Sequence, residues 1–149
     1  MNVTWVMGYP TGKEQGQYLV VDLGGTKLRV CDVFLAGRDE GYQITQEKYD
    51  LPLNLRTDPA DHLWKYIADC VSLFIHQHHN AGQTSKKLPL AFTFSYPVTQ
   101  TSISDGVLQH WTNSFDVPGV EGHDVVPQLQ AALDRKVSTK LLICGQQPD

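Results

Sequence analysis

Long apolar runs are absent from this chain. No stretch of its 149 residues approaches the roughly 18 consecutive apolar residues of a membrane-spanning helix, and the N-terminal residues have neither the basic nor the apolar region of a signal peptide. An excess of basic residues is absent as well: Lys plus Arg number 12 against 16 Asp plus Glu, a formal net charge of -4. We therefore expect neither a membrane nor a nucleic acid as a partner.

Cysteine is also scarce. Cys31, Cys70 and Cys144 are far apart and form no C-x-x-C pair. An odd number of cysteines without a secretory leader indicates reduced thiols in a cytoplasmic protein, and buried side chains rather than metal ligands. Hydrophobic residues make up 41% of the chain and charged residues 19%, so length and composition predict one folded domain.

The order of apolar segments predicts an α/β fold. Three strands are expected at Tyr18–Val21, Leu28–Leu35 and Tyr42–Leu51, and the two glycines between the first two favour an antiparallel meander. A fourth strand, Leu88–Ser95, is apolar at both parities, which predicts a central strand covered on both faces. A short last strand is expected at Lys140–Cys144.

Two helices are predicted between these strands. Asp58 and Pro59 have the residue types of an N-cap and a first helical position, and apolar residues then recur at intervals of three and four. Asp124 is placed to cap a second helix. The order βββαβαβ predicts a mixed sheet. Three histidines near the end of the first helix are expected to interact with its dipole rather than to bind a metal; they are His76, His78 and His79.

The strongest chemical signal is Asp22-Leu-Gly-Gly-Thr26, between the first two strands. Gly24 and Gly25 lack the Cβ atoms that keep a ligand from the main chain, and they tolerate positive φ. The N–H groups of this turn form an anion site for a phosphate, and Asp22 is suited to hold Mg²⁺. Arg29 and Lys48 add positive charge if the strand register brings them close. The alternative is an ordinary Gly-Gly hairpin, since short glycine motifs match often by chance.

Context favours the phosphate site. Tyr18-Leu-Val-Val-Asp-Leu-Gly-Gly-Thr-Lys-Leu-Arg-Val30 resembles the first phosphate motif of the sugar kinase, heat-shock ATPase and actin superfamily. Leu90-Ala-Phe-Thr-Phe-Ser-Tyr-Pro97 and Leu108-Gln-His-Trp-Thr112 resemble the hexose-binding signature of fungal-type hexokinases, and the resemblance covers about residues 5 to 136. It implies a ribonuclease H-like fold, the small domain of a hexokinase, and ATP-dependent phosphorylation of a hexose at its 6-hydroxyl, the first step of glycolysis.

The resemblance also implies roles for individual residues. Asp22, Gly24, Gly25 and Thr26 would face the phosphates of ATP-Mg, with Asp22 toward the metal and Lys48 at a position that the family uses for ATP. Ser95, Thr112 and the residue at 113 belong to the hexose side. A sugar is read by hydroxyls and amides that donate and accept hydrogen bonds. Phe94 and Trp111 are expected to pack in the core.

Two departures from the family pattern bear on activity. The family has Trp-Thr-Lys-Gly-Phe where this chain has Trp111-Thr-Asn-Ser-Phe115, so Asn113 replaces a lysine beside the transferred phosphate. The family continues into a strand ending in Asn-Asp-Thr, whose Asp is the general base, and then into a large domain; residues 137–149 contain no such motif. We predict a small domain at 1–136, a divergent tail at 137–149, no large domain and no catalytic base.

Three functional hypotheses follow from these departures. The first is a truncated member of the family that is inactive alone. The second is a non-catalytic, hexokinase-like regulatory or sugar-binding protein, which Asn113 and the missing base favour. The third is a non-functional fragment that associates through the face left open by the missing large domain.

Overall fold

The computed structural model describes residues 9–37, 41–79, 88–137 and 141–143. Its first three strands form the predicted antiparallel meander, in which Val21 pairs with Val30 and Val30 pairs with Glu47. Alternate residues of the first strand, Leu19, Val21 and Leu23, are fully buried on one face of the sheet. The three strands are β1 (Gln15–Leu23), β2 (Lys27–Ala36) and β3 (Tyr42–Asp50).

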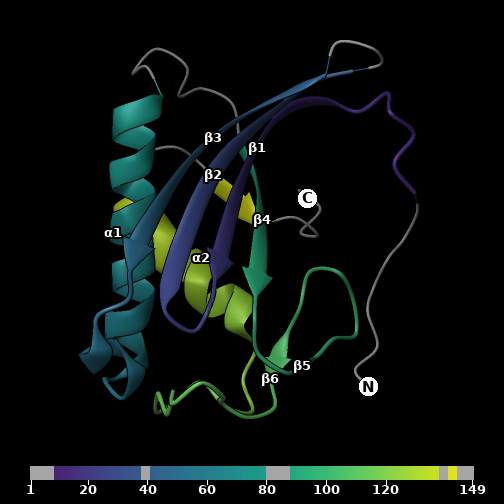
Figure 1. The fold of residues 1–149 in the computed structure, drawn as a ribbon. Helices are drawn as coiled ribbons and strands as arrows, with labels where there is room; N and C mark the ends of the chain where they lie inside the picture. The colour runs from purple at the N-terminus through teal and green to yellow at the C-terminus, as the bar shows by residue number, and fades with distance from the viewer. Residues whose placement is uncertain (1–8, 38–40, 80–87, 138–140, 144–149) are drawn as a thin grey trace.

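Two further strands complete a mixed five-stranded sheet of order β3-β2-β1-β4-β7, and β4 pairs in parallel with both of its neighbours. Both α-helices lie behind this sheet in Figure 1 and cover one of its faces. The prediction of an α/β fold with a mixed sheet is confirmed. The remaining elements are α1 (Ala60–His78), β4 (Leu88–Phe94), α2 (Val125–Lys136) and β7 (Leu141–Ile143).

The start of α1 differs from the prediction. The N-cap of α1 is Pro59, which makes no side-chain capping hydrogen bond, so the assignment of Asp58 as the cap is wrong. The Asp58 carboxylate instead accepts a hydrogen bond from the Asn54 amide (2.8 Å) and lies 3.3 Å from His62 Nδ1. Both partners contact the same carboxylate oxygen, Oδ2, and the carboxylate therefore faces Asn54 and His62. At α2 the prediction is correct, because Asp124 Oδ1 accepts from the Val126 N–H.

The prediction that β4 is covered on both faces is also wrong. β4 is an inner strand of the sheet, but only Leu88 and Leu90 are buried, while Ala91 and Thr93 on the opposite face are exposed. The apolar run of β4 is explained by burial on the helix-covered face of the sheet and by packing among its aromatic side chains. Tyr42 and Ile44 of β3 are 70% and 53% exposed. Association through the open face stays a prediction.

Three small elements have no counterpart in the sequence prediction: a 3-10 turn η1 (Leu53–Arg56) and the two-stranded ribbon of β5 (Val98–Thr99) and β6 (Val107–Leu108). Cys31 and Cys70 are buried free thiols, and Cys144 lies outside the described residues. Among the described residues, no helix has the length and apolar character needed to cross a membrane.

Two histidines at the C-terminal end of α1 lie close to carboxylates of the sheet. His78 Nε2 lies 3.4 Å from the Glu47 carboxylate on β3, and His79 Nε2 lies 3.4 Å from the Asp32 carboxylate on β2. The end of α1 is therefore placed against β2 and β3, which the dipole argument did not indicate.

Candidate functional site

The glycine turn connects β1 to β2 at the end of the sheet where β1 and β4 terminate (Figure 1). The Gly24 N–H donates to the Lys27 carbonyl at 3.0 Å and therefore closes the turn itself. Within the described part of the chain, no residue accepts a hydrogen bond from the N–H of Gly25 or Thr26. Two main-chain donors thus remain for a ligand, rather than three.

The two glycines are not required for positive φ, because neither has one. Gly25 is required for a close approach: a Cβ at this position would lie 3.1 Å from Asn113 Cβ and 3.3 Å from Asn113 Nδ2. Such distances are shorter than ordinary carbon–carbon contact. Positive φ therefore does not explain either glycine, and the neighbour that a Cβ of Gly25 would meet is the Asn113 side chain. The close approach of a ligand to these glycines stays a prediction.

Two buried or half-buried side chains hold the carbonyls of the same turn. Tyr96 Oη donates to the Gly24 carbonyl at 3.2 Å, and Arg56 Nη2 donates to the Gly25 carbonyl at 3.2 Å. Burial raises the pKa of Tyr96 to about 12, so its hydroxyl stays protonated and able to donate at neutral pH. Neither residue was predicted from sequence. Tyr96 lies inside the Phe-Ser-Tyr-Pro motif, and Arg56 gave no local signal.

The charged residues form a row across the open face of the sheet. Asp22 pairs with Arg29, whose Nη1 lies 3.5 Å from Asp22 Oδ2, and Arg29 in turn pairs with Lys48. Since neighbouring strands are about 4.8 Å apart, Lys48 lies about 10 Å from Asp22 across the sheet. The register therefore brings Arg29 to the turn and leaves Lys48 one strand further away.

The second half of the site is the loop 112–115. The Phe115 N–H donates to the Thr112 carbonyl at 3.1 Å, and the two central residues, Asn113 and Ser114, have φ of 56° and 64°. Positive φ at both central positions is typical of a type I′ turn, in which asparagine is favoured and serine is not. Asn113 thereby lies against Gly25.

A cluster of aromatic side chains packs around Phe115 at the end of this loop. Tyr96 contacts Trp111 edge-on with ring centroids 4.8 Å apart, and Trp111 stacks on Phe115 at 5.4 Å. Phe94 joins the cluster at 5.8 Å from Trp111. The prediction that Phe94 and Trp111 pack in the core is confirmed, because Trp111 is buried and Phe94 packs against the core.

Ser95 lies at the same end of the sheet as the glycine turn. It follows β4 directly, its N–H donates to the Leu23 carbonyl at 3.2 Å, and its side chain is exposed. Among the described residues, none forms a hydrogen bond with its hydroxyl. The structure thus gathers the phosphate turn, Ser95 and the 112–115 loop at the ends of β1 and β4.

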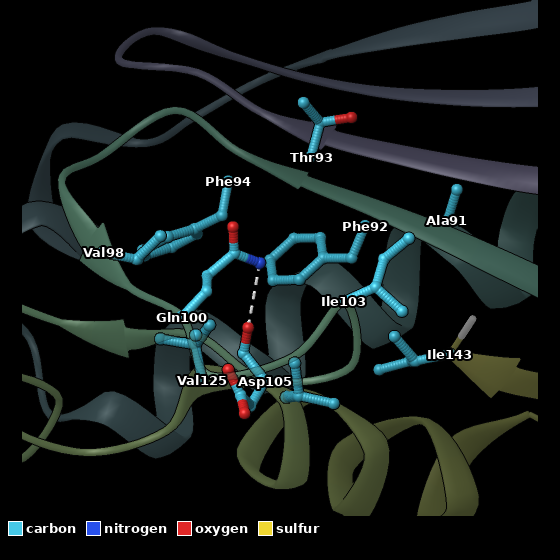
Figure 2. A pocket seen from close by; sticks show the side chains of 12 residues that line it. Ala91, Phe92, Thr93, Phe94, Val98, Gln100, Ile103, Asp105, Val125 and Ile143 are labelled. Atoms are coloured by element: carbon cyan, nitrogen blue, oxygen red, sulfur yellow. Dashed lines mark hydrogen bonds between the residues drawn. The ribbon is translucent and has the colours of Figure 1, made fainter. Parts of the chain in front are cut away.

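A separate cavity of about 290 Å³ lies between β4, the 98–106 loop and the start of α2 (Figure 2). Phe92 and Phe94 point into it, whereas Thr93 points away from it, and Gln100 Nε2 donates to the Asp105 carbonyl at 3.0 Å. None of the sequence-predicted site residues lines this cavity.

The fold and the site together define a class of protein. A meander followed by parallel strands, with two helices on one face and a glycine turn at the end of the first strand, is the small domain of a sugar kinase. The hexokinase of Schistosoma mansoni, whose structure was solved in complex with glucose, has the same fold: the TM-score is 0.84 at 36% identity over 96% of this chain and 32% of that one. A polyphosphate/ATP-glucomannokinase from Arthrobacter sp. strain KM shares the fold alone, with a TM-score of 0.53 at 15% identity over 87% of this chain and 44% of that one.

The sequence comparisons identify the family. The hexokinase family model matches residues 1–144, and the chain belongs to the hexokinase family. A hexokinase of Emericella nidulans is 55% identical over 87% of this chain and 26% of its own length. A hexokinase of Saccharomyces cerevisiae is 49% identical over 89% of this chain and 27% of its own. The chain therefore spans about a quarter of the length of these curated relatives.

Proposed function

We propose that this chain supplies the phosphate-binding turn and one wall of the hexose site of an ATP-dependent hexose 6-kinase. The observation that carries the proposal is the contact between the two halves, in which Asn113 lies against Gly25. A kinase must bring a phosphate and a sugar hydroxyl to adjacent positions, because phosphoryl transfer depends on positioning and on electrostatic stabilisation. An ordinary Gly-Gly hairpin does not require its turn to contact the 112–115 loop.

On this proposal, the free N–H groups of Gly25 and Thr26 donate to phosphate oxygens of ATP. The Asp22 carboxylate fits a hydrated Mg²⁺, since carboxylate oxygen is the ligand that this cation prefers. Mg²⁺, when bound, neutralises charge on the transferred phosphate. Arg29 adds positive charge beside Asp22, and Lys48 acts at longer range or on a more distant part of the nucleotide.

The hexose side is assigned to the hydroxyls of Ser95 and Thr112 and to the carboxamide of Asn113. Each of these groups both donates and accepts, as the hydroxyls of a sugar require. The proton of the 6-hydroxyl needs a general base, and the family motif Asn-Asp-Thr that supplies it does not occur in residues 1–149. General-base catalysis contributes about 10²–10⁴ in rate, so the 149-residue chain alone is expected to give no turnover.

A second candidate is a hexokinase-like protein that binds sugar without phosphorylating it. Asn113 is the observation that favours it, because asparagine brings no positive charge to the transferred phosphate, and losing one such group costs about 10²–10³ in rate. The small-domain limit at Lys136, the divergent tail and a cytoplasmic location all stay predictions under either candidate.

A coupled assay for glucose 6-phosphate, run beside glucose and Mg-ATP binding measurements on the 149-residue chain, separates the hypotheses. The proposal predicts no turnover, with weak binding of both ligands mapped to the turn and to the 112–115 loop. Glucose binding without any response of the turn to Mg-ATP favours the sugar-binding protein. A folded chain that binds neither ligand contradicts both candidate functions. Turnover by the chain alone contradicts the prediction that it lacks a general base.

A further inference from the structure

The N–H groups of Gly25 and Thr26, which remain for a ligand, belong to two peptide planes. The carbonyl group of each plane accepts a hydrogen bond from a side chain. The carbonyl of Gly24 and the N–H of Gly25 share one peptide plane, and the carbonyl of Gly25 and the N–H of Thr26 share the next. The described peptide bonds are all trans. In a planar trans peptide the N–H points opposite to the C=O, so fixing a carbonyl also fixes the direction of the neighbouring N–H.

Each of these two carbonyls accepts a hydrogen bond from a different side chain. Tyr96 Oη holds the Gly24 carbonyl and Arg56 Nη2 holds the Gly25 carbonyl, both at 3.2 Å. The N–H of Gly25 therefore points away from Tyr96, and the N–H of Thr26 points away from Arg56. We propose that Tyr96 and Arg56 are positioning residues for the anion site, which aim its two main-chain donors without touching the ligand. This inference rests on the proposed function.

Both positioning residues are anchored in the sugar half of the site. The Arg56 guanidinium lies 5.7 Å from the centre of the Phe115 ring, a cation–π contact, and the Arg56 carbonyl accepts from the Asp116 N–H at 2.7 Å. Tyr96 packs edge-on against both Trp111 and Phe115. The direction of the phosphate donors is thus set by side chains that also support the 112–115 loop.

Tyr96→Phe and Arg56→Met test the proposal, because each removes the side-chain donor to one carbonyl. A Kd for Mg-ATP is fitted from the amide shifts of Gly25 and Thr26 in NMR titrations of the 149-residue chain, well below the unfolding temperature. We expect each variant to raise this Kd at least about fivefold, which corresponds to about 1 kcal/mol, because a main-chain donor that is no longer aimed at the phosphate binds it less well. Arg56→Lys, which keeps a donor for the carbonyl, is expected to recover part of the loss.

Tyr66→Phe is the matched control. Tyr66 Oη donates to the Asp50 carbonyl, outside the turn, so its loss lowers stability by a similar mechanism without changing a phosphate donor. The control is expected to leave the Kd for Mg-ATP within about twofold of the original, because the lost bond affects stability and not a donor to the phosphate. If Tyr96→Phe does not fold, the pair Arg56→Met and Arg56→Lys tests the second plane alone.

Two results would overturn this inference while leaving the proposed function intact. One is an unchanged Kd in both Tyr96→Phe and Arg56→Met. The other is an equal loss in Tyr66→Phe, which would reduce Tyr96 and Arg56 to a general structural role. If the amides of Gly25 and Thr26 in the folded original chain do not respond to Mg-ATP, the proposed function fails and the inference fails with it.

Discussion

Gly25→Ala probes the contact between the two halves of the site. The new Cβ would lie 3.1 Å from Asn113 Cβ, against an optimum of about 3.5–4.0 Å for two carbon atoms. Overpacking of this kind costs about 1–3 kcal/mol. Because Gly25 has no positive φ, alanine also restricts the unfolded chain, which offsets about 0.4–1 kcal/mol. The net expectation is a loss of about 0–2.6 kcal/mol in the free energy of unfolding.

The pair Gly25→Ala and Asn113→Gly makes this test specific. Asn113→Gly removes the opposing Cβ, and its φ of 56° suits glycine. In that background, Gly25→Ala is expected to be neutral or slightly stabilising, so the two changes are coupled by about 1–3 kcal/mol. Urea unfolding followed by the fluorescence of the buried tryptophans, Trp64 and Trp111, measures each corner of the cycle.

Gly106→Ala is the control for the substitution itself, because its Cβ would meet its nearest neighbours at 3.8 Å, an ordinary contact. It is expected to leave the free energy of unfolding unchanged or to raise it by up to about 1 kcal/mol, through the same restriction of the unfolded chain. The reasoning is refuted if Gly25→Ala destabilises the chain equally with and without Asn113→Gly.

Three further predictions concern strain, pH and the nucleotide. Ser114→Gly is expected to raise the free energy of unfolding by about 0.5–1 kcal/mol in urea titrations, because the φ of 64° strains serine and not glycine. Hydrogen bonds from Lys136, and then from Lys65, lower the pKa of Asp69 below 3.8. Asp69 therefore stabilises the fold above about pH 4 and loses this effect as the pH falls through its folded pKa, so Asp69→Asn should flatten the acid limb of a stability–pH curve. Mg-ATP is expected to bind the 149-residue chain at best in the millimolar range, about -4 kcal/mol. Asp22→Ala should weaken that binding less than about fivefold, because a charge pair in open water is worth about 1 kcal/mol; micromolar binding abolished by Asp22→Ala in calorimetry would contradict this.

The sequence predicted the elements whose periodicity is strong. The meander and both helices were found because alternation and three-to-four spacing are set by which face of each element is buried. The one-sided burial of β4 was missed because apolar residues at both parities were read as two covered faces, whereas Phe92 and Phe94 extend the helix side of the sheet. Asp58 was misassigned because Asn54 and His62 compete for its carboxylate.

The candidate site was only half predictable. Asp22 and the glycine turn are local, so a contiguous motif reveals them. Tyr96 and Arg56 act on the turn from 72 and 31 residues away along the chain, and no spacing rule predicts such contacts. The close approach of Asn113 to Gly25 depends likewise on tertiary packing. The sequence predicted that the missing Cβ atoms make room for a ligand, but it did not predict that Gly25 also makes room for the Asn113 side chain.

The most direct test of the central claim joins residues 1–136 of this chain to the remainder of the Emericella nidulans hexokinase and measures ATP-dependent formation of glucose 6-phosphate, with the whole Emericella enzyme as the positive control. The account predicts turnover, a further increase with Asn113→Lys, and a loss of about 10²–10³ in kcat/KM with Asp22→Ala. A fused protein that folds and binds glucose but forms no glucose 6-phosphate, even with Asn113→Lys, would contradict the account and favour a sugar-binding protein without kinase activity.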